Sequence, residues 1–151
     1  AKVAENMGIR VSSDDRWDDI YFRIAFEKIE PNLGRGVPTI LYDYPVCMAA
    51  LSRKKPTDPR FAERFEVYVG DTELGNAFSE LTDAAEQRRR FEYDMDLKEK
   101  LYGERYPIDD DFINAVAAMP EAAGIAIGVD RLVMLVAGVT RIEDAMWAPV
   151  A

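Results

Sequence analysis

Hydrophobic positions follow two periodicities that divide the chain into helices and strands. Apolar residues recur at helical spacing from Trp17 to Ile29, after an N-cap with acidic first-turn residues at 12–15, and Pro31 and Gly34 end this helix. Short apolar runs indicate a strand at 38–42 and a hairpin at 64–81. Further helices are predicted over 83–101 and 112–119, and a strand that runs directly into a helix over 124–135. An antiparallel hairpin flanked by helices indicates an α+β fold.

The predicted hairpin carries charged residues inside strand patterning. If Gly70 and Asp71 form a two-residue turn, Tyr68 faces Glu73 across the strands and Glu66 shares the face of Tyr68. Glu66 and Glu73 are then diagonal neighbours, about 7–8 Å apart at the backbone. Carboxylates are expensive to bury unless they hold a cation. The pair therefore predicts a site for one divalent cation.

A second polar group follows on the return strand. Strict alternation would place Asn76, Phe78 and Glu80 on the face opposite Glu73, and a bulge at Gly75 would bring them back to it. We predict that bulge. Asn76 and Glu80 would then form an anionic corner suited to a substrate ammonium group. Phe78 either forms the wall of such a pocket or is an ordinary core residue.

The segment from Gly124 to Arg131 places small residues at 124, 126 and 128 on one strand face. Small side chains leave room for a flat ligand to lie against the backbone. Arg131 follows at the start of the helix, where its guanidinium can stack on a base or bind a phosphate. The alternative is a strand packed tightly against a helix, with Arg131 paired to an acid. Together with the hairpin carboxylates, the segment predicts a site for ATP, Mg²⁺ and a cationic amino acid.

Composition narrows the class of protein. The chain has 151 residues, 48% of them hydrophobic, which suits one domain with a substantial core. A net charge of −9 argues against non-specific nucleic-acid binding. The absence of histidine excludes histidine catalysis within this segment, and the single Cys47 suggests a reducing compartment, the cytoplasm. No apolar run is long enough to span a membrane.

Three clusters of like charge have ordinary structural interpretations. Arg88-Arg89-Arg90 is interpreted as a solvated helix face, and Arg53-Lys54-Lys55 as a solvated loop. Asp109-Asp110-Asp111 is interpreted as a helix N-terminus rather than a metal cluster.

The runs Glu66–Glu80 and Gly124–Leu135 resemble the C-terminal half of the catalytic domain of class II lysyl-tRNA synthetases, the second run being motif 3 of that class. The resemblance covers essentially the whole chain, residues 1–151. It is closer still to the lysyl-tRNA-synthetase-like ligases that attach (R)-β-lysine to elongation factor P. The runs Pro38–Pro45 and Met48–Leu51 support this closer resemblance. So does Ala126, where lysyl-tRNA synthetases usually have glycine.

The resemblance implies a role for each site residue. Glu66 and Glu73 would hold Mg²⁺ and the ATP phosphates, and the Leu74 backbone would lie near the nucleotide. Gly128 would lie along the adenosine, and Arg131 would stack on adenine and reach the γ-phosphate as the catalytic residue. The amino-acid pocket would be lined by four further residues, Asn76, Phe78, Glu80 and Ala126.

The implied reaction is ATP-dependent activation of (R)-β-lysine as an adenylate, followed by transfer to a lysine of elongation factor P. The resemblance implies no tRNA and no membrane as partners, and a homodimeric full-length enzyme. Motifs 1 and 2 are absent, including the motif 2 arginine that binds the α-phosphate. We therefore expect the chain, which begins Ala1-Lys2-Val3, to be part of a longer enzyme and inactive alone. The alternatives are a fragment of a lysyl-tRNA synthetase, with lysine as its substrate, and a non-catalytic synthetase paralogue.

Overall fold

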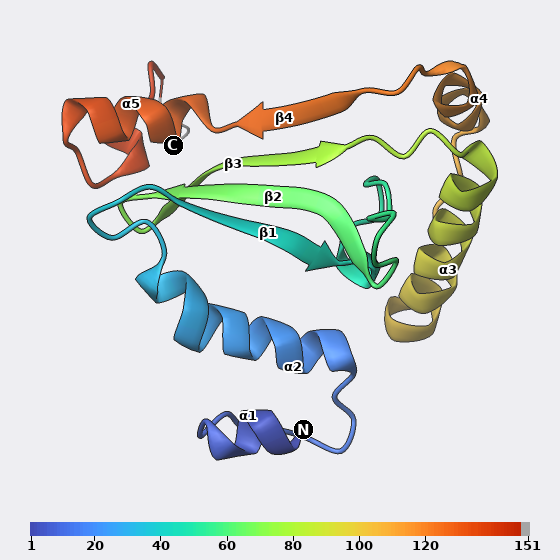
Figure 1. Cartoon of the computed structure of the whole chain (residues 1–151), viewed down its shortest axis with the longest axis horizontal. Coiled ribbons are helices and arrows are strands. Elements are labelled where there is room, and N and C mark those ends of the chain that lie inside the picture. The colour runs from blue at the N-terminus through green and yellow to red at the C-terminus, as the bar shows by residue number, and fades with distance from the viewer. Residues whose placement is uncertain (149–151) are drawn as a thin grey trace. The chain divides into compact units, whose positions relative to one another are not determined.

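The computed structural model describes residues 1–148 and contains a four-stranded antiparallel sheet with helices, the predicted α+β class (Figure 1). The strands lie in the order β1-β2-β3-β4, which is also their order along the chain. They are β1 (Thr39–Pro45), β2 (Phe61–Val69), β3 (Thr72–Ser79) and β4 (Ala123–Ile127). The α-helices are α1 (Lys2–Asn6), α2 (Trp17–Ile24), α3 (Ala84–Tyr102), α4 (Asp110–Ala118) and α5 (Val129–Ala137).

The chain divides into two compact units, and each strand contributes residues to both. Among the described residues, the first unit comprises 1–41, 66–76 and 126–148, and the second comprises 42–65 and 77–125. The predicted strand-to-helix passage is confirmed, because β4 ends at Ile127 and α5 begins at Val129. Within residues 1–148, no helix is both long and apolar enough to cross a lipid bilayer.

The first long helix of the first unit begins at Trp17, where the hydrophobic spacing starts, but its N-cap is Arg16 rather than a residue of 12–15, and its α-helical part ends at Ile24. The backbone of Arg16 donates to Asp19 at 2.9 Å, which satisfies an N–H group at the start of α2. Beyond Ile24 the chain continues as a π-helical turn over Ala25–Ile29 and a 3₁₀ turn over Glu30–Asn32. The change of helix type is not visible in the hydrophobic spacing, which the sequence extends unbroken to Ile29. Helix α1 has no counterpart among the sequence predictions.

The β2–β3 hairpin turns at Gly70 and Asp71, as predicted. Their φ angles are +58° and +63°, which is the type I′ geometry that matches the twist of a two-residue hairpin. Gly34 packs against this turn, and its carbonyl accepts a hydrogen bond from the Gly70 N–H at 2.9 Å. Gly34 has a φ of +74°, and a Cβ there would lie 2.8 Å from the Val69 backbone nitrogen. Only glycine therefore fits this close approach of two backbone segments.

Strand β1 is longer than the sequence predicts. The sequence predicts a strand over 38–42, whereas β1 extends to Pro45. Asp43 has a φ of +59°, an uncommon conformation for a residue other than glycine. In the second unit its carboxylate forms an ion pair with Lys55. Turn propensity describes only neighbouring residues, so it does not anticipate this contact between Asp43 and Lys55, which is distant in sequence.

Helices α3 and α4 both begin at capping aspartates. The Asp83 carboxylate accepts from the Glu86 N–H at 2.9 Å, and the Asp109 carboxylate accepts from the Phe112 N–H at 3.1 Å. Asp110 and Asp111 occupy the first turn of α4. The interpretation of 109–111 as a helix N-terminus is confirmed.

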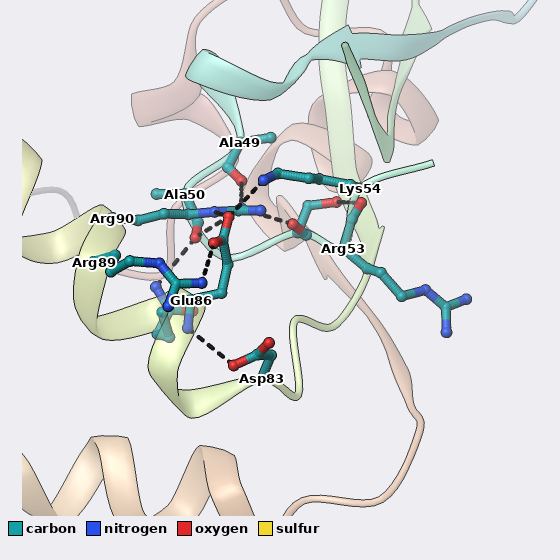
Figure 2. A network of polar contacts seen from close by, with 10 residues as sticks. Ala49, Ala50, Arg53, Lys54, Asp83, Glu86, Arg89 and Arg90 are labelled. Carbon is teal, nitrogen blue, oxygen red and sulfur yellow. Dashed lines mark hydrogen bonds and ion pairs between the residues drawn. The ribbon is translucent and has the colours of Figure 1, made fainter. Parts of the chain in front are cut away.

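The interpretation of Arg88-Arg89-Arg90 as a solvated face is wrong for Arg90. Its side chain is only 12% exposed, and its Nη1 donates to three backbone carbonyls of one loop (Figure 2). The acceptors are Ala49 at 2.9 Å, Ala50 at 3.3 Å and Ser52 at 2.8 Å. The buried amide of Gln87 also donates to the Ala50 carbonyl, at 3.1 Å. Helix α3 therefore holds the loop that follows β1.

The side chains of residues 53–55 are accessible to solvent, as interpreted, and they also form ion pairs. Lys54 forms an ion pair with Glu86 at 2.7 Å, and Arg53 forms one with Glu63 at 2.8 Å. Glu86 also contacts Arg89 at 2.7 Å and Arg90 at 3.1 Å. These cations hold the pKa of Glu86 well below its usual range, at about 2, with the Lys54 contact as the largest cause.

The Glu86 network predicts an acid-dependent loss of stability. Because the folded pKa is lowered from 4.5, the contribution of Glu86 is complete above about pH 4.5 and is lost as the pH falls toward 2. We expect Glu86→Gln to lower the free energy of unfolding at pH 7 by about 1–3 kcal/mol, after allowance for partial exposure. Urea unfolding from pH 7 to 2 measures this, and the gap from the wild type should close toward pH 2.

Glu5→Gln, which alters an exposed glutamate of α1, is the control. Its difference from the wild type should stay below about 0.5 kcal/mol at every pH. A Glu86→Gln gap that stays constant from pH 7 to pH 2 would contradict the assignment.

Candidate active site

Glu66 lies in the interior of the first unit, where the Tyr68 hydroxyl and the Asn76 amide donate to its carboxylate. Its residue is 8% exposed, and Tyr68, whose hydroxyl donates to Glu66 Oε2 at 2.6 Å, is 5% exposed. The Asn76 amide donates to Oε1 at 3.5 Å, so Asn76 lies on the same sheet face as Glu66. Regular alternation from the two-residue turn would place Asn76 on the opposite face. The contact requires an interruption of the alternation, and its location at Gly75 stays a prediction.

Arg131 contacts Glu73, which lies near the start of β3, close to the hairpin turn. Arg131 Nη1 donates to the Glu73 carbonyl at 2.7 Å and lies 3.9 Å from the Glu73 carboxylate. Their side chains are 47% and 38% exposed, so both remain accessible to a ligand. The Gly128 N–H donates to the Leu74 carbonyl at 2.9 Å, which joins β3 to the start of α5. These two contacts, Arg131 with Glu73 and Gly128 with Leu74, involve four residues to which the family resemblance gives roles in nucleotide binding.

A cavity of about 450 Å³ opens beside Glu73 and Arg131, entirely within the first unit. Glu30 also lines this cavity, and the sequence analysis did not single it out. Partial burial raises the pKa of Glu30, and the charges of Glu66 and Glu73 raise it further. The remaining lining residues are Phe26, Pro31, Tyr68, Asp71 and Thr72.

Glu30 interacts through charge with Glu66 and with Glu73, but the three carboxyl groups do not form a closed cluster. Within residues 1–148, no three acidic or cysteine side chains gather as a metal-binding group. Glu66 and Glu73 nevertheless supply the oxygen ligands that Mg²⁺ prefers, and Mg²⁺ commonly binds through one or two carboxylates together with substrate phosphates. The donor set therefore fits a magnesium ion that arrives with a nucleotide.

Glu80 and Phe78 belong to the second unit. The Glu80 carboxylate lies over Gly124, because a Cβ at Gly124 would stand 2.7 Å from Glu80 Oε1. Phe78 and Gly124 both line a cavity of about 460 Å³ in this unit. Ala126 is exposed on β4 and belongs to the first unit. The single pocket predicted for these residues and Asn76 stays a prediction, since they are divided between the units.

Two contacts escaped the sequence analysis for different reasons. The strand pattern predicts that Tyr68 faces Glu73, but it does not specify the side-chain rotamers on which the Tyr68–Glu66 hydrogen bond depends. Glu30 follows the predicted helix, and nothing local distinguishes it from a solvated glutamate. Its spacing just before Pro31 was the only available signal, and that signal concerns helix ends.

The amino-acid sequence of the chain is similar to those of a known protein family. The model for class II tRNA synthetases (D, K and N) matches residues 18–150. A Proteus mirabilis protein named elongation factor P–(R)-β-lysine ligase is 47% identical over 139 residues, 91% of this chain and 43% of that protein. Proteins of the same name from Sodalis glossinidius and Haemophilus ducreyi are each 40% identical, over 97% and 95% of this chain. The chain spans under half the length of these relatives.

The hydrogen bond within the pair Tyr68–Glu66 predicts a measurable contribution to stability. We expect Tyr68→Phe to lower the free energy of unfolding by about 1.5–3 kcal/mol, because a buried carboxylate loses one donor. Tyr93→Phe removes a hydroxyl from a residue that is 67% exposed and should change stability by less than about 0.5 kcal/mol. Urea unfolding compares the two variants, and equal midpoints would contradict a structural role for the Tyr68 hydroxyl.

Proposed function

The chain belongs to the class II tRNA synthetase (D, K and N) family, and from this premise we propose that it is part of an ATP-dependent ligase. The ligase would activate (R)-β-lysine and transfer it to a lysine of elongation factor P. The observation that carries the proposal is the cavity of the first unit, where Glu73 and Arg131 meet beside the buried Glu66. The names of relatives that are 40–47% identical to the chain support the choice of substrate and acceptor.

ATP would bind in this cavity. Arg131 is the cation of the site and would stack on the adenine and reach the γ-phosphate. Its hydrogen bond to the Glu73 carbonyl already orients the guanidinium. The backbones of Leu74 and Gly128, joined to each other by a hydrogen bond, would border the nucleotide. Glu66 and Glu73 would hold Mg²⁺, which neutralises phosphate charge when bound.

The amino acid would bind through its ammonium groups. Glu80 would accept one of them, since no other group among residues 1–148 forms a hydrogen bond or ion pair with its carboxylate. Phe78 would contact the aliphatic part of the substrate, and Asn76 would add a polar contact. The Ala126 methyl group would favour the β-amino isomer over lysine.

The reaction would proceed in two steps. The substrate carboxylate attacks the α-phosphate of ATP, which gives the aminoacyl-adenylate and releases pyrophosphate. The amine of the acceptor lysine then attacks the activated carbonyl and releases AMP. No side chain acts as a covalent nucleophile, so the rate enhancement comes from positioning and charge stabilisation.

The proposed enzyme also has a defined domain, oligomeric state and cellular compartment. Residues 1–151 would be the C-terminal part of the catalytic domain, with motif 3 at 124–135, in a homodimeric cytoplasmic enzyme that acts without tRNA. The runner-up is a lysyl-tRNA synthetase, which shares the chemistry but uses lysine and tRNA. A non-catalytic paralogue is the third candidate. Its weakness is that a protein that only binds a partner has no need for Glu66, Glu73, Glu80 and Arg131 together.

The proposal is tested in a chimera in which this chain replaces the matched 139-residue stretch of the Proteus mirabilis relative. We expect the chimera to catalyse ATP–pyrophosphate exchange that depends on (R)-β-lysine. Arg131→Met should lower kcat/KM for ATP by about 100-fold or more, as expected when a group that stabilises developing charge is removed. Arg141→Met, which alters an exposed arginine outside the site, is the matched control and should leave the exchange unchanged.

The isolated 151-residue chain should show no exchange above background, because it lacks the motif 2 arginine. Exchange by the isolated chain would refute that expectation. A folded chimera without exchange would favour the non-catalytic paralogue. Transfer of lysine to tRNA but not of (R)-β-lysine to elongation factor P would favour the runner-up.

Substrate choice is tested at Ala126. We expect Ala126→Gly in the chimera to shift the ratio of kcat/KM values toward lysine by about tenfold, because one methyl group in a pocket is worth roughly 1–3 kcal/mol. Exchange measured with each amino acid gives the ratio. Ala118→Gly, at the end of α4, controls for the loss of a methyl group elsewhere. An unchanged ratio would remove the argument for Ala126 as the selective residue.

A further inference from the structure

Gly124 lies so close to Glu80 that a side chain at position 124 would meet the end of the flexible Glu80 side chain and, among residues 1–148, no other group within 4 Å. A Cβ built on Gly124 would lie 2.7 Å from Glu80 Oε1 and 3.9 Å from Glu80 Cδ. Contacts under 3.0 Å are essentially never observed for real Cβ atoms, so an added methyl group would have to displace the carboxylate. The absent side chain of Gly124 therefore defines the space that Glu80 occupies.

The backbone of Glu80 cannot easily move to relieve such a clash. Its N–H donates to the Ala122 carbonyl at 2.9 Å, and it forms an antiparallel bridge with Ser52. The next residue, Leu81, donates to the Leu51 carbonyl at 2.9 Å. Hydrogen bonds on both sides hold this segment, so a methyl group at 124 would act on the side-chain torsions of Glu80.

The Glu80 carboxylate is half-buried and has no cationic partner among residues 1–148. This contrasts with Glu86 of the same unit, which contacts Lys54, Arg89 and Arg90. A half-buried carboxylate without a countercharge is costly unless a ligand supplies the charge. The orientation that Gly124 permits is therefore the orientation in which Glu80 would meet an ammonium group.

We infer that Gly124 is a specificity-determining positioning residue, which sets where Glu80 receives the ammonium group of the amino-acid substrate. This inference rests on the proposed function and deepens it. Gly124 itself contacts no reacting atom. It acts through Glu80, and any residue larger than glycine would push the carboxylate away from its position over the β4 backbone.

The first unit contains a parallel case that serves as an internal comparison. A Cβ at Gly128 would lie 3.0 Å from Arg131 Cδ and 3.4 Å from its Cβ and Cγ, so this glycine leaves space for the arginine stem. The two glycines therefore serve different charged side chains. Substitution of Gly128 should weaken nucleotide binding, whereas substitution of Gly124 should weaken binding of the amino acid.

Kinetics of the chimera described above separate these effects. We expect Gly124→Ala to raise KM for (R)-β-lysine by about 10- to 100-fold, as expected for a binding group misplaced by roughly 1 Å, with KM for ATP unchanged. Gly128→Ala should show the reverse pattern. A general loss of structure would instead affect both KM values or the amount of active enzyme.

A double-mutant cycle tests whether shortening Glu80 relieves the effect of Gly124→Ala. Glu80→Asp shortens the side chain and withdraws the carboxylate from position 124. In that background Gly124→Ala should raise KM for (R)-β-lysine by less than threefold. The same cycle measured by thermal unfolding of the 151-residue chain requires no catalysis, and Gly124→Ala should lower Tm more with Glu80 present than with aspartate.

These outcomes distinguish the inference from the proposed function. An active chimera whose KM for (R)-β-lysine is unchanged by Gly124→Ala overturns the inference and leaves the function standing. An inactive wild-type chimera overturns the function, and the Tm cycle then decides whether the contact exists. If Gly124→Ala fails to fold, recovery of folding by the added Glu80→Asp supports the contact. Failure of both variants to fold overturns the inference.

Discussion

The candidate nucleotide site depends on a buried carboxylate, Glu66, which lies on strand β2. Glu66 would cost several kcal/mol to bury alone. The structure offsets this cost with the Tyr68 hydroxyl at 2.6 Å and the Asn76 amide at 3.5 Å. Both donors come from the same hairpin, whose register is set by the turn at Gly70 and Asp71. The short turn therefore determines which polar groups reach Glu66.

The two glycines of the β4–α5 segment extend the same principle to charged side chains. The small residues there suggested a surface for a flat ligand, but part of the space they leave is taken by the chain itself. The Glu80 carboxylate lies over Gly124, and the Arg131 stem lies against Gly128. The small residues thus shape the site indirectly, because they leave space that longer side chains nearby occupy.

Sequence reasoning succeeded where the determining contacts are local. The hairpin turn, the start of a helix at Asp83 and the helix N-terminus at 109–111 were predicted, and the contacts at each involve residues within four positions of one another. It failed for Arg90, which donates to carbonyls about 40 positions earlier in the chain. It also missed Glu30, whose interaction with Glu66 and Glu73 is long-range. The family resemblance identified the site residues, but distances between their side chains required the fold.

Gly34 and Gly36 share nearly the same backbone conformation, with φ angles of +74° and +76°, but their surroundings differ. A Cβ at Gly34 would meet the backbone of Val69, whereas nothing lies within 4 Å of one at Gly36. Asparagine tolerates positive φ and suits the open position, while the crowded one excludes every side chain. Over evolutionary time, position 36 is thus free to drift among a few residue types, and position 34 has no neutral alternative.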